Sequence, residues 1–337
     1  MKTAVLLLLA ATTVVLAQGP LTPPGLPAAT MKTLAQIEPR TPISSAPFTI
    51  TAPGSYYLTT NLTVSSGNAI TIATNGVTLD LGGFTIKSTA ASATGYGILI
   101  NAGLCNLAIV NGFIEGGVTN TAGTYGGPGF QSGISYSASP PVNTRVAGVS
   151  VSGCLDHGIF LASGDSTVVE SCTVRTVGSY GIAASTIKGS VATGCGDIAI
   201  YGDQVSDCRG ESGSGVGLYA QTAQNCYGST NSGSSGLYAY TAQNCYGSNN
   251  SGIEGLRANY TAQNCFGSIS SGSYGLYANT AQNCYGHNSG AGTGLRAGDV
   301  AIGCRGYSDS GVGLSAFIAN SCRVIGTASI TYKYNMP

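Results

Sequence analysis

The carboxylates best suited to chemistry lie in one stretch of a chain that carries few charges. Lys and Arg number 13, and Asp and Glu also number 13, among 337 residues. Asp197, Asp203 and Asp207 lie in this stretch, followed by Arg209 and Glu211. Carboxylate oxygens are preferred calcium ligands, and a neighbouring arginine is a candidate base, so the group could serve a polysaccharide lyase. The alternative, which we favour, is a solvated irregular turn without a cofactor.

Other catalytic patterns are weaker. Glycoside hydrolysis needs two carboxylates flanking the scissile bond, and no such pair is evident. Asp156-His157-Gly158 resembles part of the Gly-His-Gly phrase of pectin hydrolases, but the first glycine and the paired aspartates are missing. No Ser-His-Asp arrangement, zinc motif or phosphate loop is recognised, and the Gly-x-Gly matches are interpreted as turn chemistry. We therefore predict a non-catalytic protein, with a divergent polysaccharide lyase or glycoside hydrolase as the alternative.

An aromatic or cationic residue recurs at one position in the second half of the chain. The positions are Tyr219, Tyr238, Arg257, Tyr277 and Arg296. Rings at the spacing of neighbouring strands stack, and a guanidinium group can lie on a ring face. One interpretation is a ladder that only stabilises the repeat, and the other is an exposed strip that binds a polysaccharide or cell-surface glycan. A second row follows the cysteines, at Tyr227, Tyr246, Phe266 and Tyr285.

These residues recur because the chain repeats every 19 or 20 residues. The tetrapeptide Gly-Leu-Tyr-Ala or a variant of it begins at Gly217, Gly236, Gly255, Gly275, Gly294 and Gly313. Leu and Ala share one face and Tyr takes the other, which is the period of a strand. Residues 248–255 hold mainly Gly, Ser and Asn without a helical stripe. We predict an all-β parallel β-helix whose coils stack around a narrow core. Leucine-rich repeats fit less well, because Ala and Thr stand where Leu is needed.

A cysteine recurs at another position of each coil. The ladder comprises Cys208, Cys226, Cys245, Cys265, Cys284, Cys304 and Cys322, and we assign Cys154, Cys172 and Cys195 to the same mark in earlier, degenerate coils. We interpret these residues as stacked buried thiols that act as small apolar side chains. Disulfides between coils are an alternative, although parallel Cβ vectors disfavour the S–S dihedral angle. Metal binding is a third interpretation, for which a linear ladder lacks tetrahedral geometry.

An asparagine precedes four of these cysteines, at Asn225, Asn244, Asn264 and Asn283. Asparagine tolerates the left-handed backbone conformation that a sharp turn between strands requires. Stacked side-chain amides can also hydrogen-bond from coil to coil. We therefore predict that this ladder is structural.

The first half of the chain carries a β-prone phrase, because residues 77–86 read VTLDLGGFTI. This phrase resembles an opening coil of the pectin-lyase-like superfamily, which implies a right-handed parallel β-helix. Residues 31–43 and 332–337 look like the ends of uncharacterised exported bacterial β-helix proteins. The resemblance implies an architecture and says almost nothing of activity.

Both ends are predicted to differ from the coils. Lys2 and the apolar residues 4–16 indicate a signal peptide at 1–17, so we expect secretion to the extracellular space or cell surface, without a membrane span after cleavage. A Pro-rich leader at 18–45 is expected to hold a short capping helix at Ala28–Glu38. The other divisions are N-terminal coils at 46–150, regular repeats at 151–325 and a C-terminal cap strand at 326–337.

Composition narrows the partners. The formal net charge is +0, which gives no electrostatic basis for binding nucleic acid. No cofactor is expected, apart from calcium if the acidic stretch forms a site. A polysaccharide or cell-surface glycan is therefore the expected partner, and the sequence does not indicate an oligomeric state.

Overall fold

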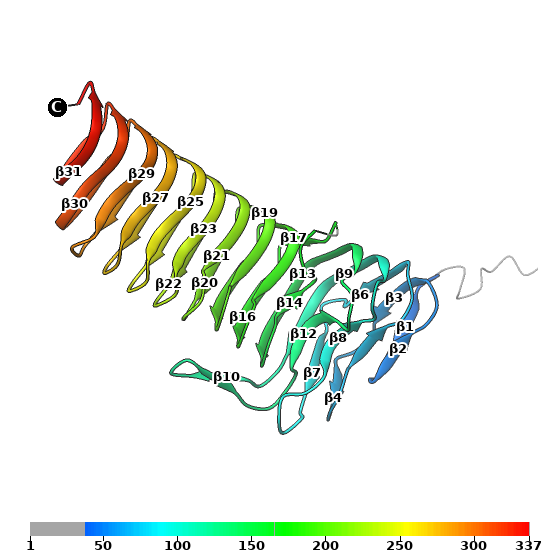
Figure 1. Cartoon of the computed structure of the whole chain (residues 1–337). Coiled ribbons are helices and arrows are strands. Elements are labelled where there is room, and N and C mark those ends of the chain that lie inside the picture. Colours follow the sequence, from blue (N-terminus) through cyan, green and yellow to red (C-terminus); the bar gives the residue numbers. More distant parts are fainter. Residues whose placement is uncertain (1–37, 165, 337) are drawn as a thin grey trace, which may run out of the picture. The chain divides into compact units, whose positions relative to one another are not determined.

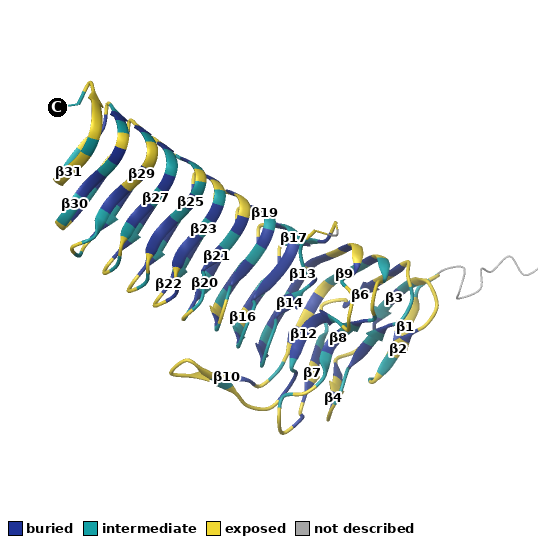
Figure 2. Ribbon diagram, in the orientation of Figure 1, coloured by how far each residue is buried: buried dark blue, intermediate teal, exposed yellow. Residues whose placement is uncertain are grey.

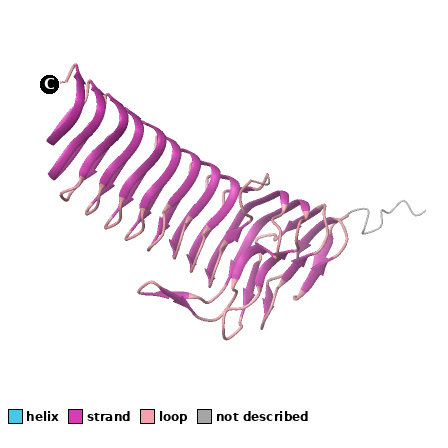
Figure 3. Cartoon of the chain, in the orientation of Figure 1, coloured by secondary structure: helices cyan, strands magenta, loops and turns pink. Residues whose placement is uncertain are grey.

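The computed structural model describes residues 38–164 and 166–336, which form a parallel β-solenoid of about 15 turns. Its strands join in one 29-stranded hydrogen-bonded sheet, with a separate two-stranded sheet beside it (Figure 1). The described residues contain no helix, and hence none that could span a membrane (Figure 3). The predicted all-β parallel β-helix is confirmed, whereas its right-handed sense stays a prediction. The signal peptide, and the capping helix up to residue 37, lie outside the described residues.

The N-terminal coils are built from short strands and two long ones. Their bounds are β1 Thr41–Ile43, β2 Phe48–Ile50, β3 Gly54–Leu58, β4 Leu62–Val64, β5 Ile70–Ile72, β6 Val77–Asp80, β7 Thr85–Ser88, β8 Tyr96–Ile100, β9 Cys105–Glu115, β10 Thr119–Thr121, β11 Thr124–Gly126, β12 Ser132–Tyr136 and β13 Val142–Cys154. The β-prone phrase at 77–86 supplies β6 and β7.

The later coils are more regular, with two strands in most repeats and one long strand in each of the last two. Their bounds are β14 Ile159–Phe160, β15 Val168–Glu170, β16 Thr173–Val177, β17 Ile182–Lys188, β18 Val191–Cys195, β19 Ile200–Ser206, β20 Arg209–Ser212, β21 Leu218–Gln224, β22 Tyr227–Thr230, β23 Ser235–Gln243, β24 Tyr246–Asn249, β25 Glu254–Gln263, β26 Phe266–Ile269, β27 Tyr274–Gln282, β28 Tyr285–Asn288, β29 Thr293–Ile302, β30 Arg305–Asn320 and β31 Arg323–Tyr334.

Equivalent residues of successive coils pair directly, so the core consists of columns that run along the stack. One column of buried aliphatic residues begins at Ile70 and Ile98 and continues through Ile134, Ile159, Ile182, Ile200, Leu218, Leu237, Leu256, Leu276, Leu295 and Leu314. Figure 2 shows these inward positions as dark blue bands that repeat from strand to strand. The predicted register of residues about nineteen apart is confirmed.

The side chains of a second inward column become smaller along the stack. It runs Leu62, Ile86, Ile114, Val151, Val174, Ala192, Gly210, Gly228, Gly247, Gly267, Gly286 and Gly306. A Cβ atom added at Gly247 would lie 2.3 Å from the carbonyl oxygen of Gly255 and 2.7 Å from the Cβ atom of Leu256. These glycines lie in strands, where close packing leaves no room for a side chain.

The turn before the cysteines uses left-handed backbone in every late coil. Asn225, Asn244, Asn264 and Asn283 have φ between 51° and 54°. The amide of Asn225 donates to Oδ1 of Asp207, at 3.0 Å, and later asparagines continue the chain of bonds. Asp207 itself has φ 55° and heads this ladder. All four asparagines therefore have the backbone conformation that the repeat predicted, and the amides of Asn225, Asn244 and Asn264 make the predicted bonds from coil to coil.

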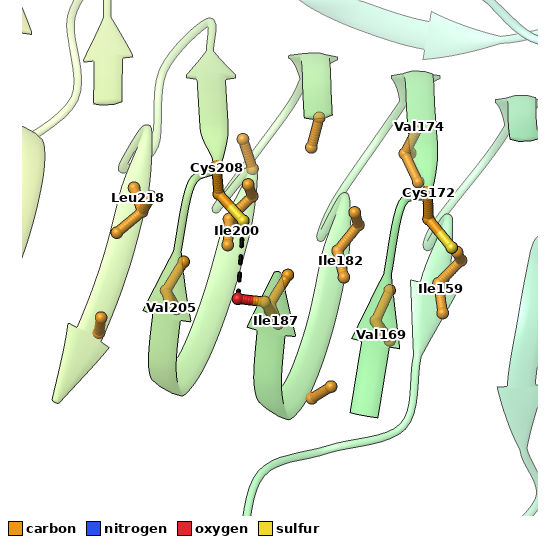
Figure 4. Close-up of a cluster of buried hydrophobic side chains, with 14 of the residues drawn as sticks. Ile159, Val169, Cys172, Val174, Ile182, Ile187, Ile200, Val205, Cys208 and Leu218 are labelled. Atoms are coloured by element: carbon orange, nitrogen blue, oxygen red, sulfur yellow. Dashed lines mark hydrogen bonds between the residues drawn. The ribbon is translucent and has the colours of Figure 1, made fainter. Parts of the chain in front are cut away.

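The cysteine column runs through the core beside these turns, and the structure holds all eleven cysteines as free thiols. Backbone N–H groups of Cys265, Cys284 and Cys304 donate to the Sγ atom of the cysteine one coil further on, at 3.4–3.5 Å. Each thiol can donate in turn to carbonyl oxygens, as Cys208 does to Ile187 (Figure 4). The column thus satisfies its weak polar groups internally.

The earlier cysteines divide between two columns. Cys172 belongs to the ladder, because its N–H donates to Ser190, whose N–H donates to Sγ of Cys208. Cys154 and Cys195 instead pair in register with Val177, on another face of the coil. Their assignment to the ladder was wrong, because coil lengths vary in this region and spacing alone does not define the column.

The predicted C-terminal cap strand corresponds to most of β31, which continues the stack in register beside β30. Asn335 repeats the left-handed turn, with φ 47°, and Met336 follows it in the place that cysteine takes in earlier coils. Met336 packs against the core, whereas the inward positions Ala328 and Lys333 are exposed. β31 is thus the last coil among the residues that the structure describes.

Candidate functional site

The five predicted strip residues lie in one column on the outer face of β21, β23, β25, β27 and β29. The rings of Tyr219 and Tyr238 stack with centroids 4.7 Å apart and planes within 5°. The Arg257 guanidinium lies 5.6 Å from the ring centroid of Tyr238 and 5.1 Å from that of Tyr277. Arg296 continues the run, 5.8 Å from the Tyr277 centroid. The structure therefore brings all five residues together.

The run extends further toward the N-terminus than the repeat predicted. Tyr201 occupies the same register position and stacks 5.2 Å from Tyr219. In the coil that precedes Tyr201 in the chain, Ala183 occupies this register position. The ring of Tyr180, which lies in the turn before Ala183, is 6.0 Å from the ring of Tyr201. Phe160 and then Tyr136 complete the row, at successive centroid distances of 5.6 and 5.7 Å. We call the whole row the Tyr/Arg strip: Tyr136, Phe160, Tyr180, Tyr201, Tyr219, Tyr238, Arg257, Tyr277 and Arg296.

Sequence reasoning missed the N-terminal part of the strip because irregular coils hide the period. One signal was available, since Phe160 and Tyr201 each follow an isoleucine at the place where Tyr219 follows Leu218. Tyr180 carried no such signal, because it comes from a different position of its coil.

Stacking decides which atoms the strip presents. Each ring in the run from Tyr201 to Tyr238 covers the face of the next, so solvent meets ring edges and phenol hydroxyls. Burial and the neighbouring phenols Tyr240 and Tyr238 raise the pKa of Tyr219 to about 12. Its hydroxyl is therefore protonated at neutral pH and can donate as well as accept. The strip offers hydrogen bonds and guanidinium groups, while few flat ring faces remain open.

A polar network interrupts the repeat beneath Arg257. Glu254 is 3% exposed, accepts a 2.9 Å bond from the Ser235 hydroxyl and pairs with Arg257 at 3.1 Å. Arg257 Nε also donates to Asn259, which donates to the Tyr238 hydroxyl. Glu254 was missed by sequence reasoning, although it replaces the serine of the neighbouring repeat in the same unit where arginine replaces tyrosine. The carboxylate fixes the Arg257 guanidinium between two rings.

The second aromatic row stacks on another strand of each coil, and cations close both of its ends. Tyr246 and Phe266 lie 4.9 Å apart with planes within 5°, and Phe266 and Tyr285 follow at 4.8 Å. Arg209 lies over Tyr227, and Arg305 over Tyr285, each 4.9 Å from the ring centroid. This row shares the chemistry of the Tyr/Arg strip and makes a natural control for it.

The predicted acidic residues are used separately. Asp207 accepts the amide of Asn225, and Glu211 pairs with Arg209. Asp197 is an exposed turn residue, and Asp203 lies half-buried in β19. Within residues 38–164 and 166–336, no group of three or more His, Cys, Asp or Glu side chains could hold a metal ion. The structure therefore does not bring the candidate calcium ligands together.

His157 lies beside the N-terminal part of the strip. Its ring stacks on Phe160 with centroids 4.3 Å apart, and burial lowers its pKa. Asp156 next to it accepts a 2.7 Å hydrogen bond from Gln131. Among the described residues, Nδ1 of His157 is the buried side-chain atom without a hydrogen-bond partner. The histidine packs on Phe160, and the negative charges of Asp156 and Asp197 partly offset the lowering of its pKa by burial.

Comparisons with known proteins add little to this geometry. No family model and no curated protein matches the chain. One solved structure, ORF18 of Geobacillus virus E2, is similar at 14% identity and a TM-score of 0.27. The match covers 84% of this chain and 52% of that chain, so this chain spans about half the length of ORF18.

Proposed function

We propose that this protein is a secreted, non-catalytic scaffold or adhesin-like protein of pectin-lyase-like architecture that binds a polysaccharide along the Tyr/Arg strip. The observation that carries the proposal is the unbroken run of rings and guanidinium groups from Tyr136 to Arg296. A linear polymer lying along this run would meet a similar contact at every coil. The signal peptide predicted at residues 1–17 supports export.

The exposed chemistry of the strip suits sugars. Phenol hydroxyls and guanidinium groups donate hydrogen bonds that sugar hydroxyls can accept, and sugar hydroxyls can donate to the phenol oxygens. Each contact with solvent-exposed groups is weak, but contacts repeated along one chain add up through effective concentration. Glu254 neutralises Arg257, whereas Arg296 is exposed and bonded to the phenol of Tyr274 at 2.6 Å. Arg296 therefore favours polymers that carry acidic groups.

Replacement of Tyr219, Tyr238 and Tyr277 together by Ser tests the proposal. The triple variant should lose retention on insoluble polysaccharide or cell-wall matrices that hold the wild-type protein, because three neighbouring contacts disappear. The matched control is replacement of Tyr227, Tyr246 and Tyr285 by Ser in the second row, where the rings are equally half-buried. Circular dichroism should show an unchanged sheet signal in both.

Unchanged retention of the strip variant on every matrix would refute the proposal. Soluble product released from a matrix by the wild-type protein would point instead to the lyase or hydrolase. In that case, loss of product on Asp197→Asn or Asp207→Asn would assign the chemistry to the acidic stretch.

A further inference from the structure

One element leaves the solenoid and returns to it. β10 and β11 pair with each other as an antiparallel hairpin outside the main sheet, and Figure 1 shows β10 reaching out toward later coils. The base of the hairpin is held firmly, because Gly117 N–H donates to Pro128 and Ala93 N–H donates to Gly127, both at 3.0 Å. The hairpin is therefore a fixed arm.

Tyr125 docks this arm onto the turns of coils much later in the chain. Its hydroxyl donates to the carbonyl oxygen of Gly194 at 3.0 Å. A Cβ atom added at Gly196 would come within 3.0 Å of the Tyr125 ring, and one added at Gly178 would come within 3.1 Å of the Tyr125 Cβ atom. In later coils, the turn position equivalent to Gly196 holds larger polar residues, of which Asn231 is the first. The glycines thus lie where the arm crosses.

Gly213 occupies this turn position between Gly196 and Asn231, and packing does not require it to be glycine. A Cβ atom there would meet only the carbonyl oxygen of Cys195, at 3.8 Å. The missing side chain leaves open space between the hairpin and the turns. This space is a cleft of about 440 Å³, lined by Asn120, Tyr125, Gly213, Ser214, Asn231 and Ser232, among others.

The lining of the cleft is polar and lacks a cation. Side-chain amides come from Asn120 and Asn231, and hydroxyls come from Ser214 and Ser232. An adjoining space of about 270 Å³ adds the carboxylate of Glu211, which Arg209 already neutralises. Amides and hydroxyls beside a phenol ring suit a neutral ligand with many hydroxyl groups, and the volume lies in the usual range for small-molecule sites.

We infer that the cleft between the β10–β11 hairpin and the Gly213 and Asn231 turns is a second binding site, for a neutral saccharide of one or two rings. None of its lining residues belongs to the Tyr/Arg strip, so the site is independent of the proposed function. It would recognise a short neutral unit such as a chain end or side branch.

Titration calorimetry of the full chain with cellobiose, maltose and N,N′-diacetylchitobiose tests the inference. At least one of these disaccharides should bind the wild-type protein. Ser232→Trp should fill the cleft and weaken binding at least about tenfold. The matched control is Ser271→Trp, because Ser232 and Ser271 are both exposed and both bond a carbonyl oxygen of the preceding turn at 3.4 Å.

A second pair of variants removes contacts without adding bulk. Asn231→Ala should weaken binding, whereas Asn250→Ala, one coil further on, should not. The strip variant with Tyr219, Tyr238 and Tyr277 changed to Ser should bind the disaccharide normally, which separates this site from the proposed function. Absence of binding by all three disaccharides would overturn the inference, as would equal effects of Ser232→Trp and Ser271→Trp.

Discussion

The side-chain amide of Asn244 donates a 3.1 Å hydrogen bond to Oδ1 of Asn225 in the preceding coil. Asn264 makes the same contact to Asn244 at 3.2 Å. One side chain thus serves the turn twice, because asparagine tolerates left-handed backbone and also links neighbouring coils. Gly303 takes the same turn with φ 60°, so the backbone conformation is the stricter requirement of the two.

The Asn244 turn gives a first prediction. Asn244→Gly removes the side-chain hydrogen bonds, but glycine adopts the left-handed backbone conformation without strain. Asn244→Ala removes the same hydrogen bonds and also places a residue with a Cβ atom in that conformation. The alanine variant should be less stable than the glycine variant by about 1 kcal/mol, the cost of left-handed backbone for a residue with a Cβ atom. Urea unfolding monitored by circular dichroism measures the difference. Equal midpoints would show that the turn is not strained.

The strand glycines give a second prediction. Gly247→Ala should destabilise the protein by about 1–3 kcal/mol, because the new methyl group would overlap the backbone of Gly255. Gly126→Ala is the control, since nothing lies within 4 Å of a Cβ atom there and its φ is not positive. Urea midpoints should fall for the first variant only. A harmless Gly247→Ala would mean that the facing strands β24 and β25 can move apart at little cost.

The Glu254–Arg257 pair gives a third prediction. Arg257→Tyr alone leaves a buried carboxylate without its cation, whereas Glu254→Ser with Arg257→Tyr reproduces the residues of the preceding coil, Ser235 and Tyr238. The double variant should be more stable than Arg257→Tyr, with a coupling energy of about 1–3 kcal/mol. A double-mutant cycle from urea unfolding of the four proteins measures it. Additive effects would show that the pair is not coupled.

The buried thiols give a fourth prediction, on pH dependence. Burial raises the pKa of Cys154 and of Cys195 to about 12. An unfolded thiol ionises near pH 8.5, so the unfolded chain releases protons at lower pH than the native protein does. The free energy of unfolding should therefore be unaffected by these groups at neutral pH and fall as the pH rises from about 8.5 toward 12.

Urea unfolding at increasing alkaline pH measures this decline. Tyr and Lys also titrate there, so the informative comparison is with Cys154→Val plus Cys195→Val, which copies Val177 of the same column. The variant should lose stability less steeply above pH 8.5. Identical slopes in both proteins would show that the two thiols do not contribute.

Thiol reactivity gives a fifth prediction. Cys105 is partly exposed, whereas the other ten cysteines are buried. A thiol reagent should therefore modify Cys105 alone in the native protein and all eleven thiols after unfolding without reductant. Cys105→Ser should abolish the native reaction. Fewer reactive thiols in the unfolded protein would reveal disulfides between coils.

Local features of the sequence were sufficient to predict the coil. Alternation of Leu and Ala against Tyr indicates strands, and the asparagines indicate left-handed turns, because both signals depend on residues close together in the chain. The regular spacing then defines the register of the late coils, which is why Tyr219, Tyr238, Arg257, Tyr277 and Arg296 were correctly expected in one column.

Contacts that depend on coils of unequal length could be decided only by the tertiary structure. Cys195 pairs with Val177, Tyr180 covers the place of Ala183, and Tyr125 reaches Gly194 across 69 positions of sequence. The shrinking inward column is likewise invisible locally, because whether a glycine turns the chain or admits a neighbouring backbone depends on what packs against it. Periodicity reports the repeat, whereas packing between coils decides which side chains meet.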